Sequence, residues 1–161
     1  MKNIKFMINR FRAGCLLLMI FMFSSCEEIN IPAEMIGSWE SETIPVTVRT
    51  HSLKTGFVFT SDTAVIKFTI NSDNTASGSI GSAQFVNAVI MKNGGNPDIT
   101  GVAYNIECGS VGKIFENDPL DEKVVELWLG PVKDNTIDAE LRYTQGLAYF
   151  PMASAIYSRV D

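Results

Sequence analysis

Residues 136–143 read Thr-Ile-Asp-Ala-Glu-Leu-Arg-Tyr, an unbroken alternation of polar and apolar side chains. Because successive side chains of a β-strand point to opposite faces of a sheet, the apolar members of this stretch would share one buried face. The same period of two recurs at residues 66–70 and 102–108, and less cleanly at 125–129, where Trp128 falls on the opposite face. These stretches predict half-buried antiparallel strands.

Turn-forming residues separate these stretches at intervals of about 8–12 positions, and no stretch carries an apolar face of helical period. Glycine and asparagine tolerate positive φ, and proline presets its own φ, so each cluster predicts a turn. The clusters are Lys54-Thr55-Gly56, Asn71-Ser72-Asp73-Asn74, Asn93-Gly94-Gly95-Asn96-Pro97, Cys108-Gly109-Ser110, Asn117-Asp118-Pro119, Gly130-Pro131 and Gln145-Gly146. We therefore predict an all-β fold, an antiparallel up-and-down barrel of eight to ten strands, with a β-sandwich as the alternative. Closure into a barrel removes exposed strand edges, which favours the barrel.

The first 25 residues have the composition of a secretory signal peptide. Their longest apolar run has 11 residues, too few to cross a bilayer, which takes about 20, so cleavage is favoured over a retained N-terminal anchor. They contain no acidic residue and four basic ones, Lys2, Lys5, Arg10 and Arg12, followed by the apolar run from Ala13 to Phe23. The rest of the chain carries nine basic and 18 acidic residues, a net charge of −9, which argues against binding a nucleic-acid backbone.

The segment Phe23-Ser24-Ser25-Cys26 resembles the lipobox of bacterial lipoproteins, with Phe23 where leucine is usual. The resemblance implies that Cys26 is acylated, with palmitate among the chains, and becomes the mature N-terminus. Residues 26–34 would then be an acylated tether, and 35–161 the folded domain. Several acyl chains would anchor the protein stably in the cell envelope, as an outer-membrane lipoprotein. Glu27-Glu28 is similar to the acidic signal that sends some Bacteroidetes lipoproteins to the cell surface.

The tripeptide Gly37-Ser38-Trp39, at the start of the domain, resembles the Gly-x-Trp signature of lipocalins. Small lipocalin-like lipoproteins of Bacteroidetes type are similar to this chain in length and lipobox. In that family the tryptophan closes one end of the barrel and an arginine near the last strand packs over its ring. The resemblance implies that Arg159 covers Trp39, a cation–π contact worth about 0.5–2 kcal/mol. An ordinary core tryptophan beside an exposed arginine is the alternative.

The aromatic residues allow two interpretations of the barrel interior. They could line a cavity for a small apolar ligand, or they could fill a dry core, because the interior of a small barrel is just wide enough for side chains. The candidate lining residues are Phe57, Phe59, Phe68, Phe85, Tyr104 and Tyr143.

The residues that carry chemistry are few. His51 is the only histidine, so neither a catalytic triad nor a zinc site is expected, and we predict a protein without enzymatic activity, metal or cofactor. Cys15 leaves with the signal peptide and Cys26 is acylated, so Cys108 has no disulfide partner and is expected to be a small buried side chain. Asp62-Thr63-Ala64 resembles the O-glycosylation site of Bacteroidetes proteins, with Thr63 as the acceptor.

Two functional hypotheses follow from these observations. The first is a lipid-anchored, lipocalin-like barrel that binds a small apolar ligand. The second is a non-catalytic surface module that contacts an envelope protein or a glycan, with a filled interior and an exposed apolar or aromatic patch.

Overall fold

The computed structural model describes residues 29–52, 54, 56–93, 101–145 and 148–161, which fold into ten strands after a single 3-10 turn. The predicted all-β fold is confirmed. The 3-10 turn is η1 (Ala33–Met35), and the strands are β1 (Gly37–Ser41), β2 (Ile44–Ser52), β3 (Gly56–Ala64), β4 (Ile66–Ile70), β5 (Thr75–Ile80), β6 (Ala83–Lys92), β7 (Tyr104–Val111), β8 (Lys123–Lys133), β9 (Thr136–Gln145) and β10 (Ala148–Arg159).

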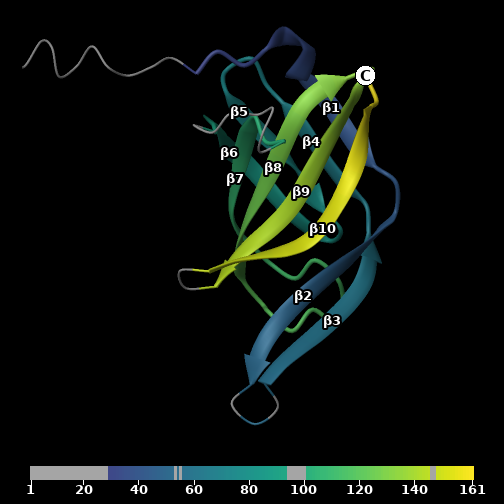
Figure 1. Ribbon diagram of the computed structural model, residues 1–161, viewed down its shortest axis with the longest axis vertical. Helices are drawn as coiled ribbons and strands as arrows, with labels where there is room; N and C mark the ends of the chain where they lie inside the picture. The colour runs from purple at the N-terminus through teal and green to yellow at the C-terminus, as the bar shows by residue number, and fades with distance from the viewer. Residues whose placement is uncertain (1–28, 53, 55, 94–100, 146–147) are drawn as a thin grey trace, which may run out of the picture.

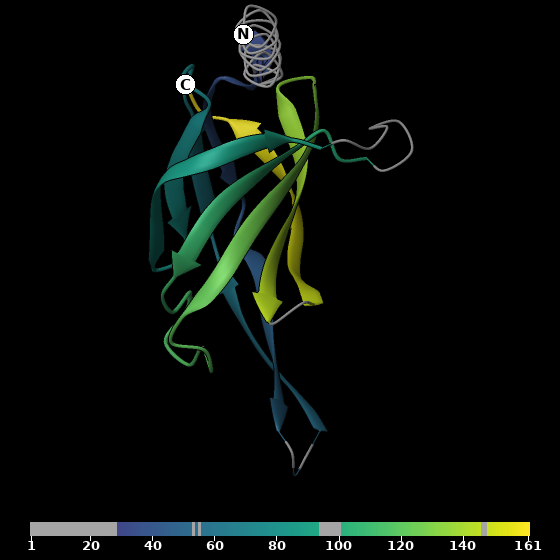
Figure 2. The ribbon, with the colours of Figure 1, turned by 90° about the vertical axis from the view of Figure 1, so that its left-hand side faces the viewer.

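Eight of these strands form a closed antiparallel barrel in the order β1-β10-β9-β8-β7-β6-β5-β4 (Figures 1 and 2). Closure depends on β1, which pairs with the last strand on one side and with β4 on the other. Trp39 is opposite Arg159 in the first pairing and opposite Phe68 in the second. The sheet therefore has no free edge in the barrel, and the sandwich alternative does not apply.

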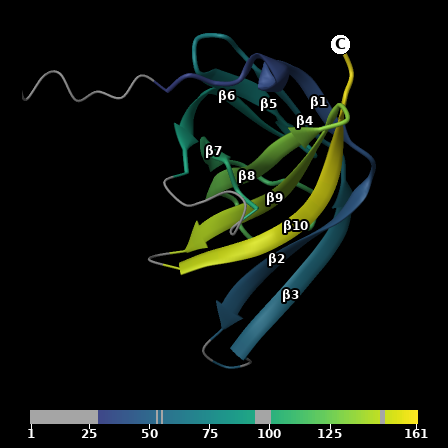
Figure 3. The same ribbon diagram turned by 45° about the horizontal axis from the view of Figure 1, so that its top comes forward.

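The other two strands, β2 and β3, leave the barrel and form a separate antiparallel hairpin. Their register runs from Ile44 opposite Ala64 to Ser52 opposite Gly56. Figures 1 and 3 show this hairpin extending past one end of the barrel and lying along β10. The hairpin lies at the end of the barrel opposite η1 and the first described residues (Figures 1 and 2).

The barrel interior is filled by one continuous hydrophobic core. In β9 burial alternates along the strand as its sequence predicts, with Ile137, Leu141 and Tyr143 at most 1% exposed. Ile31 is also buried, so the packed domain begins within the stretch expected to be a tether. No helix among the described residues is long and apolar enough to cross a membrane.

Candidate functional site

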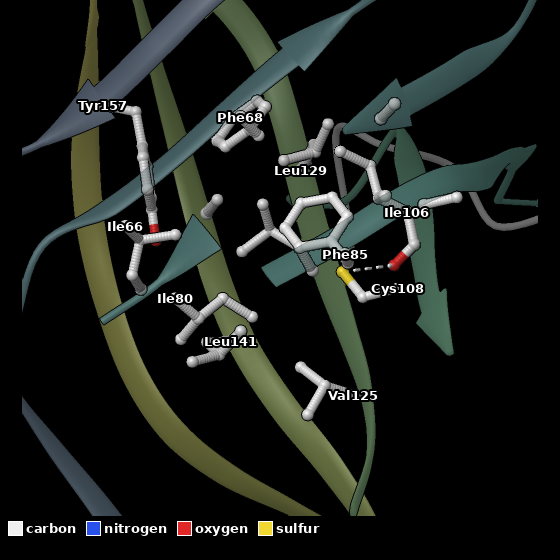
Figure 4. Packing of buried hydrophobic residues seen from close by; sticks show 14 of the residues in the cluster. Ile66, Phe68, Ile80, Phe85, Ile106, Cys108, Val125, Leu129, Leu141 and Tyr157 are labelled. Carbon is white, nitrogen blue, oxygen red and sulfur yellow. Dashed lines mark hydrogen bonds between the residues drawn. The ribbon is translucent and has the colours of Figure 1, made fainter. Parts of the chain in front are cut away.

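Four of the six aromatic residues predicted to line a cavity are core residues of the barrel. Phe68, Phe85, Tyr104 and Tyr143 are each at most 9% exposed. Figure 4 shows Phe68 and Phe85 among aliphatic side chains from neighbouring strands, and the Phe68 ring lies 5.3 Å from that of Tyr157. These rings therefore fill the barrel instead of bordering an open cavity.

Gly78 on β5 makes room for one of these rings. A Cβ atom at this position would overlap the carbonyl oxygen of Lys67 and lie 2.8 Å from the Cα of Phe68 and 2.9 Å from the Cζ of Phe85. The missing side chain lets two strands and the Phe85 ring approach closely.

The prediction that Phe57 and Phe59 line the cavity is wrong. Both belong to β3, which pairs only with β2 outside the barrel, and their side chains are 52% and 64% exposed. The intervening Val58 is 41% exposed, so this strand presents apolar side chains on both of its faces. The sequence pattern placed Phe57 and Phe59 on one face, but the barrel wall does not cover that face.

Arg49 on β2 organises these aromatic residues. Its guanidinium carbon lies 3.4 Å from the centroid of the Phe57 ring, 4.8 Å from that of Phe150 and 5.8 Å from that of Phe59. Each of these distances is within cation–π range. The guanidinium Nε is buried and has no hydrogen-bond partner among the described residues. Arg49 thus holds the exposed rings of the hairpin against the end of β10.

A hydrogen bond joins the same arginine to the barrel interior. The phenol of Tyr143 donates to the carbonyl oxygen of Arg49, and the Tyr143 ring lies 5.4 Å from the Phe150 ring. Burial raises the pKa of Tyr143, although this hydrogen bond opposes the shift. The hairpin is therefore fixed to the barrel through Tyr143, and not only through its connections to β1 and β4.

We call this region the hairpin surface, defined as the half-buried Arg49 with the exposed His51, Phe57 and Phe59 on one face of the hairpin, and the exposed Val58 on the other face. His51 is exposed, as expected, and its ring meets that of Phe57 edge-on at 5.1 Å. A surface with clustered aromatic rings around an arginine has the composition of binding hot spots in protein interfaces. This surface is the candidate functional site.

The barrel end near η1 is closed by Trp39 and Arg159. The Trp39 ring is 1% exposed, its Nε1 donates to the carbonyl oxygen of Met35 at 2.9 Å, and the guanidinium carbon of Arg159 lies 5.6 Å from the ring centroid. The Arg159 guanidinium also donates to the carbonyl oxygens of Glu34 and Ile36. Arg159 therefore links the last strand to the 3-10 turn and covers the indole, in the arrangement that the lipocalin resemblance implies.

The opposite end is covered by the connection between β7 and β8, residues 112–122. Ile114 and Phe115 are buried there, and the Ser82 amide donates to the carbonyl oxygen of Ile114 at 3.0 Å. An ion pair between Lys123 and Asp118, 2.7 Å long with both side chains at most 1% exposed, fixes the connection from within. Both ends of the barrel are thus closed by side chains.

No family model, curated protein or solved structure matches this chain.

The remaining predicted sites lie apart from the hairpin surface or outside the described residues. Cys26, the expected acylation site, lies outside them. Thr63, the expected O-glycosylation acceptor, is exposed near the base of the hairpin. Cys108 is buried, as expected, and burial raises its pKa to about 12. The described residues contain no cluster of three or more potential metal ligands.

Sequence reasoning missed the hairpin surface, although the sequence carries one signal for it. Phe57-Val58-Phe59 breaks the alternation, with three apolar residues in succession, directly after the turn Lys54-Thr55-Gly56. A run with apolar side chains on both faces, at the tip of a hairpin, needs a cover on each side or remains exposed.

Proposed function

We propose that the protein is a lipid-anchored binding module of the cell envelope, which contacts a partner protein through the hairpin surface and does not carry a ligand inside its barrel. One observation carries this proposal. The interior aromatic residues are buried in a filled core, whereas Phe57 and Phe59 stand 52% and 64% exposed on a projecting hairpin.

The position of the hairpin relative to the N-terminus supports this function. The first described residue, Ile29, is three positions after Cys26, a reach of about 10 Å at full extension. The hairpin lies at the other end of the barrel (Figures 1 and 2). If Cys26 is acylated, the barrel stands between the membrane and the hairpin surface, which then faces away from the lipid.

The energetics of the hairpin surface also suit a binding role. The Phe57 and Phe59 rings leave apolar surface in contact with water. Covering this surface in an interface contributes a favourable free energy of about 25 cal/mol for each Å² buried. Arg49 restricts the Phe57 ring before binding, which lowers the entropy cost of ordering that side chain in the complex. Aromatic anchors of this type account for most of the binding energy in protein interfaces.

A site-specific photo-crosslinking experiment in the native host tests this proposal. A photoreactive phenylalanine analogue replaces Phe59 in one variant and Val86 in a control variant. Val86 is 72% exposed on β6 of the barrel wall, and so matches Phe59 in exposure and apolar character. We expect one discrete adduct from position 59, absent at position 86 and lost when Phe57 is changed to serine. Equal labelling at both positions would overturn the proposal.

The anchor has its own test. Cells fed an alkyne fatty acid should label the protein, and Cys26→Ser should abolish the label and release the protein from membranes. Label that survives this substitution would show that Cys26 is not the acylated residue. Because the crosslinking result does not depend on this one, the two parts of the proposal can fail separately.

A further inference from the structure

The outer face of β8, β9 and β10 carries a groove of about 440 Å³ that shares no residue with the hairpin surface. Its walls are the side chains of Trp128, Asp138, Glu140, Ser154 and Ile156, with Val102 at one border. We propose that this groove binds a neutral saccharide, with Trp128 as the stacking platform. This inference is independent of the partner contact through the hairpin.

The strand register places the key side chains in one row across four strands. Asn105 on β7 is opposite Trp128 on β8, Trp128 is opposite Glu140 on β9, and Glu140 is opposite Ser154 on β10. Side chains directly opposite one another on the same face have Cβ atoms about 5 Å apart. Amide, indole, carboxylate and hydroxyl groups therefore follow one another along a line perpendicular to the strands, on a rigid barrel wall.

Two contacts hold the indole of Trp128 in a fixed orientation. Its Nε1 donates to Oε2 of Glu126 at 2.7 Å, and the guanidinium carbon of Arg142 lies 3.8 Å from the centroid of the ring. Arg142 is held in turn by Glu140, whose Oε2 accepts from Nη2 at 2.7 Å. The Tyr149 ring lies 6.2 Å from the indole, and Trp128 is half-buried and lines the groove, so part of the indole surface is open. A preordered aromatic surface is what the apolar C–H face of a sugar ring requires for stacking.

Polar groups suited to sugar hydroxyls border this platform. Asp138 and Ser154 are exposed, and no side-chain hydrogen bond or ion pair joins either of them to another described residue. The groove thus offers the unpaired carboxylate of Asp138 and the unpaired hydroxyl of Ser154 next to an aromatic ring, which matches a ligand with hydroxyl groups around an apolar face.

The charge of the groove decides which saccharides fit. Asp138 and Glu140 line the groove, and Arg142, which contacts Trp128, is already paired with Glu140. Carboxylates repel the acid groups of uronic or sialic acids, and they accept hydrogen bonds from neutral hydroxyls. Ile156, which is 61% exposed at the border of the groove, adds apolar contact area. Acidic saccharides are therefore excluded by charge, and the hydroxyl-matching groups beside Trp128 suit a neutral one.

A glycan array with neutral, amino and acidic members tests the proposal. The full chain is purified in a detergent without a sugar headgroup, and the best ligand is then measured by isothermal titration calorimetry. We expect binding to neutral oligosaccharides and none to acidic ones. The chain has two tryptophans and Trp39 is 1% exposed, so the ligand should shift the emission of Trp128 alone, and Trp128→Phe should abolish the shift.

Variants locate the site. Trp128→Ala should weaken binding by about 30-fold, which corresponds to about 2 kcal/mol, the loss typical of an aromatic hot spot. Ser154→Ala and Asp138→Asn, both at exposed positions, should weaken binding without a change in melting temperature, and Val86→Ala on β6 should have no effect. The proposal is overturned if no neutral glycan binds, if acidic or amino glycans bind instead, or if the groove variants bind as tightly as the Val86→Ala control.

Discussion

Replacing Lys123 with methionine should destabilise the barrel strongly, because it leaves a carboxylate buried without its cation. Nζ of Lys123 lies 2.7 Å from Oδ2 of Asp118, and the two side chains are 1% and 0% exposed. Nζ also donates to the carbonyl oxygens of Gly112 and Leu120 at 3.1 and 3.2 Å. Methionine fills a similar volume, so the loss is mainly electrostatic. Breaking a buried pair by removing one partner costs about 3–5 kcal/mol.

Backbone amides that donate to Asp118 determine where in this range the loss in the free energy of unfolding falls. After the substitution, the carboxylate of Asp118 would still accept from the amides of Ile114 and Leu120, at 2.9 and 3.0 Å. These two hydrogen bonds compensate part of the buried charge, so we expect a loss near the lower limit, about 3 kcal/mol. Adding Asp118→Asn to Lys123→Met should recover part of this loss by removing the charge.

The same connection provides a matched control. Lys113 and Asp121 form an ion pair of 3.2 Å in which the side chains are 48% and 90% exposed. Exposed pairs contribute less than about 1 kcal/mol, so Lys113→Met should have little effect. Equilibrium urea unfolding, followed by tryptophan fluorescence, measures both variants. Equal losses in the two variants would refute the argument from burial.

Three further predictions concern other parts of the barrel. Arg159→Ala should lower the free energy of unfolding by about 1–2 kcal/mol in urea titrations, since it removes the contact over Trp39, and Arg159→Lys should recover only part because an ammonium lacks the planar face. Gly78→Ala should cost about 1–3 kcal/mol in the same assay through overlap with the facing strand, and an unchanged midpoint would contradict this packing. The folded pKa of Cys108, about 12, is above its ordinary value of 9.0, so its contribution to stability is complete below pH 9 and is lost as the pH rises toward 12. In the folded protein a thiol reagent should therefore react with Cys108 at pH 8 only as fast as the chain unfolds, and rapid labelling would contradict its burial.

The barrel could be predicted from the sequence because the alternation of polar and apolar residues can be seen within one strand, although its cause is the burial of one strand face in the folded protein. Wherever one face of a strand is covered, its side chains must alternate, and residues 136–145 show this along their whole length. The Gly-x-Trp motif and Arg159 similarly identified the two strands that meet when the sheet closes.

The hairpin surface could not be predicted in the same way. Phe57 and Phe59 have the same spacing as Phe68 and Ile70, which are core residues, because spacing records which side chains share a face and not what covers that face. Whether β3 pairs inside the barrel or leaves it depends on the pairing of β1 with β4, which is a contact between strands distant in sequence.

Distant contacts explain the other omissions too. Asn117-Asp118-Pro119 predicts a turn, but nothing local shows that Asp118 is buried against Lys123. Trp128 was correctly placed on the outer face, whereas the row that it forms with Glu140 and Ser154 depends on the register of three strands.

Native mass spectrometry of the protein purified from its own host tests the central claim most directly, since it weighs whatever the barrel holds. A filled interior predicts a mass equal to that of the acylated mature chain, with no apolar small molecule retained after gas-phase removal of detergent. An apolar molecule that stays bound in stoichiometric amount would contradict a barrel filled by Phe68, Phe85, Tyr104 and Tyr143, and would favour the first hypothesis, a barrel that binds a small apolar ligand.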